Sequence, residues 1–135
     1  MRLGKASTYA VFATVYLADH LGDGPIQGRF IAEEYGIPAE YLLKIMQQLV
    51  RAQVLKSERG RGGGFTLGKA PSKVSLLDIV EAIEGPVNGE LSLRREIRGA
   101  ETTKDKVQQA CTTIAEHSRS VLRKMTIKHL ARNGN

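Results

Sequence analysis

The chain has 135 residues, of which 41% are hydrophobic, and it carries 20 lysines and arginines against 14 acidic residues, a formal net charge of +6. This length fits one domain with a modest core, and the basic excess favours a polyanionic partner such as nucleic acid or an anionic membrane surface. The single cysteine excludes an intrachain disulfide and a four-cysteine metal site within one chain, and it suits a reducing cytoplasm.

The first predicted helix, from Ser7 to Leu21, is apolar on most sides, as expected of a central helix. Its apolar run at 9–18 follows the basic Arg2 and Lys5, which mimics a secretory signal peptide. The run continues into charged residues without a small-residue cleavage site, and no stretch is long enough to span a bilayer. We therefore expect a cytoplasmic protein with no membrane partner. Arg2 and Lys5 are either a solvated terminus or a basic arm that touches the DNA backbone.

Two predicted helices follow, joined by a tight turn. The first spans about 28–35 and is stopped by Gly36. The second runs from Pro38, which suits a first helical turn, to about Ala52, and its apolar residues recur at spacings of three and four. These inward-facing residues are Leu42, Ile45, Met46 and Leu49. Two helices so close together predict a helix-turn-helix.

The opposite side of the second helix carries Tyr41, Lys44, Gln48 and Arg51. Taken alone, such a side is the ordinary solvated face of an amphipathic helix. As the second helix of a helix-turn-helix it becomes a candidate recognition helix, whose N-terminal residues meet base edges. Lys44 could then bind guanine or phosphate, Tyr41 a phosphate, and Glu40 could accept a hydrogen bond from cytosine.

Two short predicted strands, at about 54–58 and 65–67, flank the stretch Arg59-Gly60-Arg61-Gly62-Gly63-Gly64. A nucleotide-binding loop would need a following Lys-Ser or Lys-Thr and a helix, and both are missing. A flexible surface hairpin is the ordinary alternative. A DNA-binding wing explains more, because glycines allow close approach to phosphates and the two arginines supply charge. Residues 51–69 also hold five basic side chains against Glu58 alone.

Beyond the hairpin, Ser75 and Asp78 form an acidic variant of a capping box that starts a short helix. Gly85 ends this helix. Residues 86–102 are polar and without clear period, and they include Arg94, Arg95 and Arg98, so we expect a mobile loop.

The last long element is a helix predicted over 103–125. Its apolar or small residues recur at steps of four and three, which makes a heptad seam suited to helix pairing. The seam consists of Val107, Cys111, Ile114, Ser118, Val121 and Met125. A long helix projecting from a small domain most often packs against its symmetry mate. Ile127 and Leu130 indicate a short final helix.

Neither a metal site nor an enzyme active site is expected from the remaining polar residues. Cys111 lies on the heptad seam, where a small core residue is the ordinary interpretation and an intersubunit disulfide is the alternative. The three histidines lack metal-like spacing, and the sequence holds no nucleophile–base constellation.

Three stretches resemble a known family: MRL…YA (1–3 and 9–10), YLLKIMQQLVRAQVLKSERGRGGGFTLG (41–68) and VSLLDIVEAIEG (74–85). They are similar to the small bacterial winged helix-turn-helix regulators that include IscR, NsrR and CymR, the Rrf family. The resemblance implies a mainly α fold with a two-stranded wing and a long C-terminal dimerisation helix. It also implies a homodimer on palindromic operators, with DNA contacts from Lys5, Tyr41, Lys44, Arg59 and the turn Gly62–Gly64.

Two departures from the family pattern matter. Lys5 stands one place earlier than the family's usual lysine. Many members bind an iron–sulfur cluster through three cysteines between the short helix and the long one, whereas residues 86–110 hold no cysteine here. We therefore expect no cofactor, and a signal that comes from a protein partner, a small molecule or no ligand at all.

The resulting hypothesis is a homodimeric, sequence-specific regulator of transcription, a repressor, that binds double-stranded DNA. Residues 1–85 would form the DNA-binding domain, 86–102 the mobile loop and 103–135 the dimerisation helix and tail. The alternative is a dimeric protein-interaction module that has lost specific DNA binding.

Overall fold

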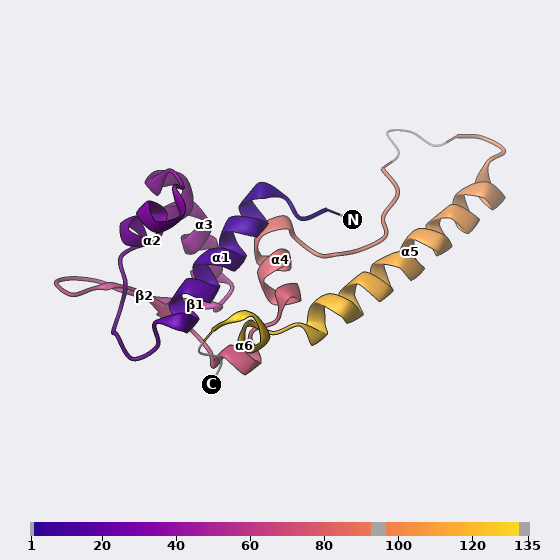
Figure 1. Ribbon diagram of the computed structural model, residues 1–135. Helices are drawn as coiled ribbons and strands as arrows, with labels where there is room; N and C mark the ends of the chain where they lie inside the picture. Colours follow the sequence, from indigo (N-terminus) through magenta and orange to yellow (C-terminus); the bar gives the residue numbers. More distant parts are fainter. Residues whose placement is uncertain (1, 93–96, 133–135) are drawn as a thin grey trace.

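The protein consists of a group of short helices around helix α1, with one long helix projecting from it (Figure 1). The computed structural model describes residues 2–92 and 97–132. The mainly helical architecture with a two-stranded sheet confirms the predicted fold class. In chain order the elements are α1 (Lys5–Asp19), α2 (Gly28–Tyr35), α3 (Ala39–Arg51), β1 (Leu55–Glu58), β2 (Gly64–Leu67), the 3₁₀ turn η1 (Pro71–Lys73), α4 (Leu76–Glu84), α5 (Glu101–Lys124) and α6 (Ile127–Leu130).

Helix α1 lies at the centre and contacts α3, α4, α6 and β2. Its buried side consists largely of small residues, among them the fully buried Ala10 and Ala13, which let the neighbouring backbones approach closely. The helix begins two residues earlier than predicted, because the Gly4 carbonyl accepts hydrogen bonds from both the backbone and the hydroxyl of Thr8. It ends two residues earlier than predicted, where the His20 ring bonds to the Tyr16 carbonyl.

Helices α2 and α3 form the predicted helix-turn-helix. Gly36 adopts a left-handed conformation with φ of +66°, which ends α2 as the sequence indicated. The N–H of the following Ile37 donates to the carbonyl of Ala32, and Ile37 is buried in the turn. The predicted inward face of α3 is confirmed, because its four members are at most 2% exposed: Leu42, Ile45, Met46 and Leu49.

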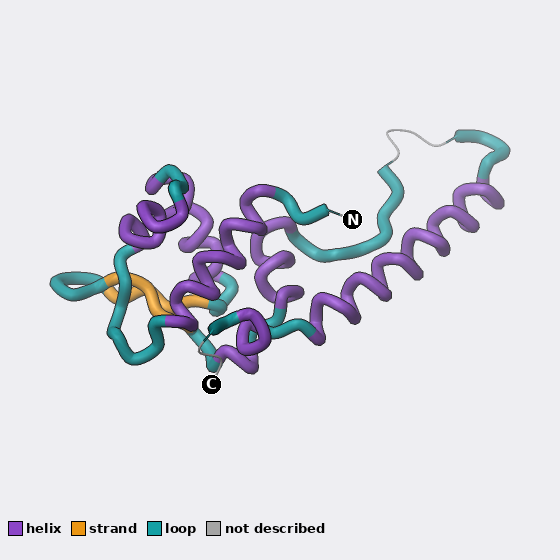
Figure 2. Tube along the Cα trace, viewed as in Figure 1, coloured by secondary structure: helices purple, strands orange, loops and turns teal. Residues whose placement is uncertain are grey.

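Strands β1 and β2 pair in an antiparallel hairpin, with Leu55 opposite Leu67 and Glu58 opposite Gly64 (Figure 2). Phe65 is buried and also forms a β-bridge with Ile26, so the segment before α2 lies along the second strand. Strand β2 is therefore fixed to the segment that leads into the helix-turn-helix, while the hairpin tip extends away from the helices (Figure 1).

The C-terminal elements return to the same core. The Ser75 hydroxyl accepts from the Asp78 N–H at 3.1 Å and the Asp78 carboxylate accepts from the Ser75 N–H at 2.9 Å, which confirms the predicted capping box of α4. After α5, the fully buried Ile127 anchors α6 beside α1. No helix within residues 2–92 and 97–132 is long and apolar enough to cross a membrane.

The hairpin glycines differ in how well they would tolerate an added Cβ atom. Gly64 has a φ of +149°, and a Cβ there would lie 2.5 Å from the Ile26 carbonyl, whereas a Cβ on Gly62, with φ of +76°, would meet open space. We expect Gly64→Ala to lower the free energy of unfolding by about 2–3 kcal/mol, through backbone displacement as well as strain. Gly62→Ala should lower it by about 1 kcal/mol. Urea denaturation followed by circular dichroism measures both, and equal losses would contradict the expectation.

Candidate DNA interface

The N-terminal ends of α1 and α3 meet on one surface. The rings of Tyr9 and Tyr41 pack edge to face, with centroids 5.9 Å apart and planes at 82°. The ammonium of Lys5, one helical turn before Tyr9, lies 5.8 Å from the centroid of the Tyr9 ring. Lys5 and Tyr41 are far apart in the sequence, and this aromatic contact brings them together.

Helix α3 turns its polar side to solvent next to this point. Glu40, Tyr41, Lys44 and Arg51 are exposed, and Gln48 is half-buried. Neither Lys44 nor Arg51 forms an ion pair with another residue in the described ranges. Cations without intramolecular partners on one side of a helix are available for phosphates or base edges.

The hairpin adds two more exposed cations, Arg59 and Arg61, at its tip. The turn at the tip is closed by the Gly63 N–H, which donates to the Gly60 carbonyl at 3.0 Å. A Cβ on Gly63 would lie 2.3 Å from the Glu58 carbonyl oxygen. Sequence reasoning assigned these glycines to close approach of phosphates, but at Gly63 the close neighbour is the chain's own backbone.

The basic start of α1 is held from its other side by α4. The hydroxyl of Ser7, which is fully buried, donates to the Glu84 carboxylate at 2.5 Å. Arg2 and Lys5, on the same segment, are exposed. Sequence reasoning assigned no functional role to Ser7, Tyr9 or Glu84. The spacing of the aromatic residues 9, 12 and 16 along α1 is the signal that could have indicated Tyr9.

The aromatic row on α1 continues away from α3. Phe12 and Tyr16 both contact Tyr35 at the end of α2, with ring centroids 5.7 and 6.0 Å from it. Burial raises the pKa of the Tyr35 hydroxyl, and the negative charges of Asp19 and Glu34 raise it further. The Tyr35 hydroxyl therefore stays neutral at neutral pH. The aromatic row packs α1 against the end of α2 and against the start of α3.

Helix α5 projects with its N-terminal half clear of the other helices (Figure 1), and its buried residues, Ala115 and Leu122, lie in its second half. The predicted seam is divided between two environments. The three members spaced seven residues apart, Val107, Ile114 and Val121, are 45%, 64% and 67% exposed, and Met125 is 39% exposed. Cys111 and Ser118 are half-buried. An exposed aliphatic stripe at seven-residue spacing is unusual on a solvated helix and indicates an interaction surface.

The segment after α4, expected to be part of a mobile loop, is hydrogen-bonded to α5 over 87–91. Arg119 pairs with Glu81 at 2.6 Å, and the same Glu81 carboxylate accepts from the Val87 N–H at 2.8 Å. Further along, the Gln108 amide donates to the Gly89 carbonyl at 2.6 Å and accepts from the Leu91 N–H. Arg94 and Arg95, named above as part of the loop, lie outside the described residues.

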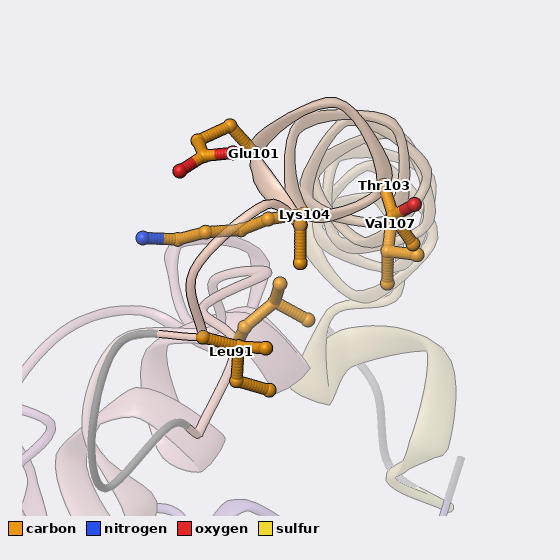
Figure 3. A pocket seen from close by; sticks show the side chains of 7 residues that line it. Leu91, Glu101, Thr103, Lys104 and Val107 are labelled. Carbon is orange, nitrogen blue, oxygen red and sulfur yellow. The ribbon is translucent and has the colours of Figure 1, made fainter.

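A mainly apolar cavity of about 280 Å³ lies between this segment and the first turns of α5. It is lined by Leu91, Ile97, Ala100, Glu101, Thr103, Lys104 and Val107. Figure 3 shows the charged ends of Glu101 and Lys104 extending to the same side of the helix, away from Val107. Aliphatic side chains therefore form most of its wall.

The side chains near the cavity do not fit an iron–sulfur cluster. Cys111 is the single cysteine of the chain and is half-buried on α5. Within residues 2–92 and 97–132, no group of three or more histidine, cysteine, aspartate or glutamate side chains is placed to hold a metal ion. A cluster needs several thiolate or imidazole ligands at one point, and this arrangement does not supply them.

Comparisons with known proteins agree with this geometry. The model of a family described as Rrf2, iron-dependent transcriptional regulator, matches residues 3–133. IscR of Photorhabdus laumondii is 33% identical over 96 residues, 71% of this chain and 58% of that protein. CymR of Bacillus subtilis is 31% identical over 88 residues, 65% of this chain and 64% of that protein. Both relatives are HTH-type transcriptional regulators, and the matched region spans less than two thirds of the length of each relative.

The structure of CymR, described as the global cysteine regulator of Bacillus subtilis, is similar over nearly its whole length. It matches 97% of this chain and 96% of that chain with a TM-score of 0.77, at 26% sequence identity. The family model covers the helix-turn-helix, the wing and the long helix together. The chain therefore belongs to the Rrf2 family, whose members are winged helix-turn-helix transcriptional regulators and not enzymes.

Proposed function

We propose that this protein is a homodimeric repressor of transcription that binds a palindromic operator without an iron–sulfur cluster. The observation that carries the proposal is that each element that a winged helix-turn-helix uses for DNA carries an exposed basic group. Lys5 at the start of α1, Lys44 on α3 and Arg59 on the wing are all exposed. Their combined charge suits a phosphate backbone.

Each element has a distinct task in the proposed complex. Helix α3 enters the major groove with its N-terminal end, so that Glu40, Tyr41 and Lys44 meet bases and the adjacent phosphates. The wing lies on the flanking backbone or minor groove, where the negative potential attracts Arg59 and Arg61. Lys5 and Arg2 neutralise phosphates beside α3.

Dimerisation through α5 would supply the symmetry of the operator. The exposed stripe of Val107, Ile114 and Val121 supports this, because pairing two copies would remove these side chains from water. A two-fold dimer presents its two recognition helices to major grooves about one turn of DNA, roughly 34 Å, apart.

The signal in this proposal is a small molecule, a protein or none, rather than iron. The segment 87–91 and the cavity beside it occupy the place between α4 and α5 where a regulatory ligand or partner could act on the dimerisation helix. The protein would work with the chromosome in the cytoplasm.

A protein-interaction module that has lost DNA binding is the second candidate, and the exposed stripe on α5 alone would suit it equally. The salt dependence of binding distinguishes the two candidate functions. Binding to DNA weakens steeply as salt rises, because phosphate contacts release counterions. A mainly apolar protein interface does not weaken in that way.

The first prediction from this proposal distinguishes the contribution of the wing to DNA binding from that of the recognition helix. Arg59→Ala should weaken binding to every DNA sequence by a similar factor and reduce the salt slope by about one. Lys44→Ala should change the preferred bases as well as the affinity. Fluorescence anisotropy with fragments selected from genomic DNA, at several salt concentrations, measures both. Lys128→Ala, an exposed cation on α6 outside the proposed interface, is the control. Unchanged affinity in Arg59→Ala would reject the wing assignment.

The second prediction concerns the stripe on α5. Ile114→Glu places a charge at the middle of the proposed interface and should convert the dimer to a monomer of 14.8 kDa. Thr113→Glu adds the same charge to the exposed neighbouring position and should stay dimeric. Light scattering coupled to size-exclusion chromatography gives the mass. A monomeric wild type, or a dimeric Ile114→Glu, would contradict the assignment.

The third prediction concerns Cys111. If this thiol only fills space, Cys111→Ser should keep both the dimer and the operator affinity within about twofold. Wild-type protein purified without oxygen should be colourless, with iron far below one atom per chain. Stoichiometric iron, or dimers that dissociate only when a reductant is added, would overturn this view of the cysteine.

A further inference from the structure

We infer that Tyr9 is a positioning residue of the DNA interface, whose ring fixes Lys5 and Tyr41 relative to each other. The inference rests on the proposed function, because it assigns a task within that interface. Tyr9 is half-buried between the two residues. Its ring contacts Tyr41 edge to face at 5.9 Å, and the Lys5 ammonium lies 5.8 Å from the ring centroid.

The first N–H groups of the two helices receive no side-chain cap. Neither Gly4 before α1 nor Pro38 before α3 provides a side-chain cap. A helix end without a cap depends on tertiary contacts to hold its first turn. Ser7 ties the start of α1 to Glu84, and the Tyr9–Tyr41 contact ties it to the start of α3. Tyr9 is thus the aromatic link between the basic end of α1 and the recognition helix.

The ring also restricts a flexible cation. A free lysine side chain loses rotamer freedom when it binds a phosphate, and this loss weakens the contact. An ammonium held near an aromatic ring has already lost part of that freedom. Lys5 is on the same side of α1 as Tyr9, four residues earlier, so the ring can guide it toward the same surface as Tyr41.

The hydroxyl of Tyr9 has no role in this arrangement, since it makes no hydrogen bond with any residue in the described ranges. Phenylalanine keeps the ring and should therefore replace tyrosine without loss. If the hydroxyl instead contacted a phosphate directly, phenylalanine would be as harmful as leucine. The conservative variant thus distinguishes positioning from direct DNA contact.

The next aromatic residue of the row provides a matched control. Phe12 is on the same helix and contacts Tyr35 instead of Tyr41, with centroids 5.7 Å apart. Phe12→Leu removes a comparable ring without touching Lys5 or Tyr41. It should leave operator affinity within about twofold.

The experiment measures operator affinity and its salt slope for Tyr9→Leu, Tyr9→Phe, Phe12→Leu and Lys5→Ala, using a fragment that wild-type protein selects from genomic DNA. Tyr9→Leu should weaken binding roughly tenfold and lower the salt slope by up to about one, because one phosphate contact is lost. Tyr9→Phe should match the wild type. Lys5→Ala should cost little more in the Tyr9→Leu background, since coupled residues are not additive.

Thermal melting identifies variants that fail to fold, and Tyr9→Met, which keeps apolar bulk without a ring, then replaces Tyr9→Leu. Wild-type affinity in a folded ring-free variant would overturn the inference, and so would full additivity with Lys5→Ala or a defect in Tyr9→Phe. These outcomes leave the proposed function standing if wild-type protein binds DNA with a steep salt slope. A wild type that does not bind DNA would reject both.

Discussion

Close packing against helix α1 is the constraint on which the rest of the structure depends. The side chains of Ala10 and Ala13 are single methyl groups, so α3, α4 and α6 can all approach the same helix closely. A larger residue at either position would push at least one of them outward, because interiors of this density have no spare volume. The helix-turn-helix is thereby joined through one central element to α4, which contacts α5.

This arrangement gives α1 two roles. Its small side holds the core together, while its aromatic row contacts the helix-turn-helix from Tyr41 at one end to Tyr35 at the other. The same helix is tied to the end of α4 through Ser7 and Glu84. Because α4 leads directly into the segment that lies on α5, a change in the position of α5 has a short physical route to the proposed DNA-binding surface.

The glycines of the wing are required for two different physical reasons. Gly63 and Gly64 are required by the chain's own backbone, which passes too close for any Cβ. Gly60 and Gly62 face open space and are required by their left-handed conformation instead. Arg59 and Arg61, which flank Gly60, have no such backbone requirement, and both side chains are exposed at the tip.

Much of the fold followed from local pattern. The period of Leu42, Ile45, Met46 and Leu49 defined the buried face of α3, Gly36 defined the end of α2, and Ser75 with Asp78 defined the start of α4. These signals are local because hydrogen bonds within one turn and the spacing of side chains on one helix decide them. The basic character of the hairpin was equally readable.

The sequence by itself could not separate the two sides of the long helix. Its heptad pattern treated Cys111 and Ser118 like Val107 and Ile114, and only the tertiary structure distinguished the half-buried pair from the exposed pair. Nor could spacing along the chain bring Tyr9 to Tyr41 or Ser7 to Glu84. The sequence determined the helices, the turn and the charge of the hairpin, because these depend on neighbours in the chain. The tertiary structure decided which faces meet, because that depends on how whole helices share one limited core.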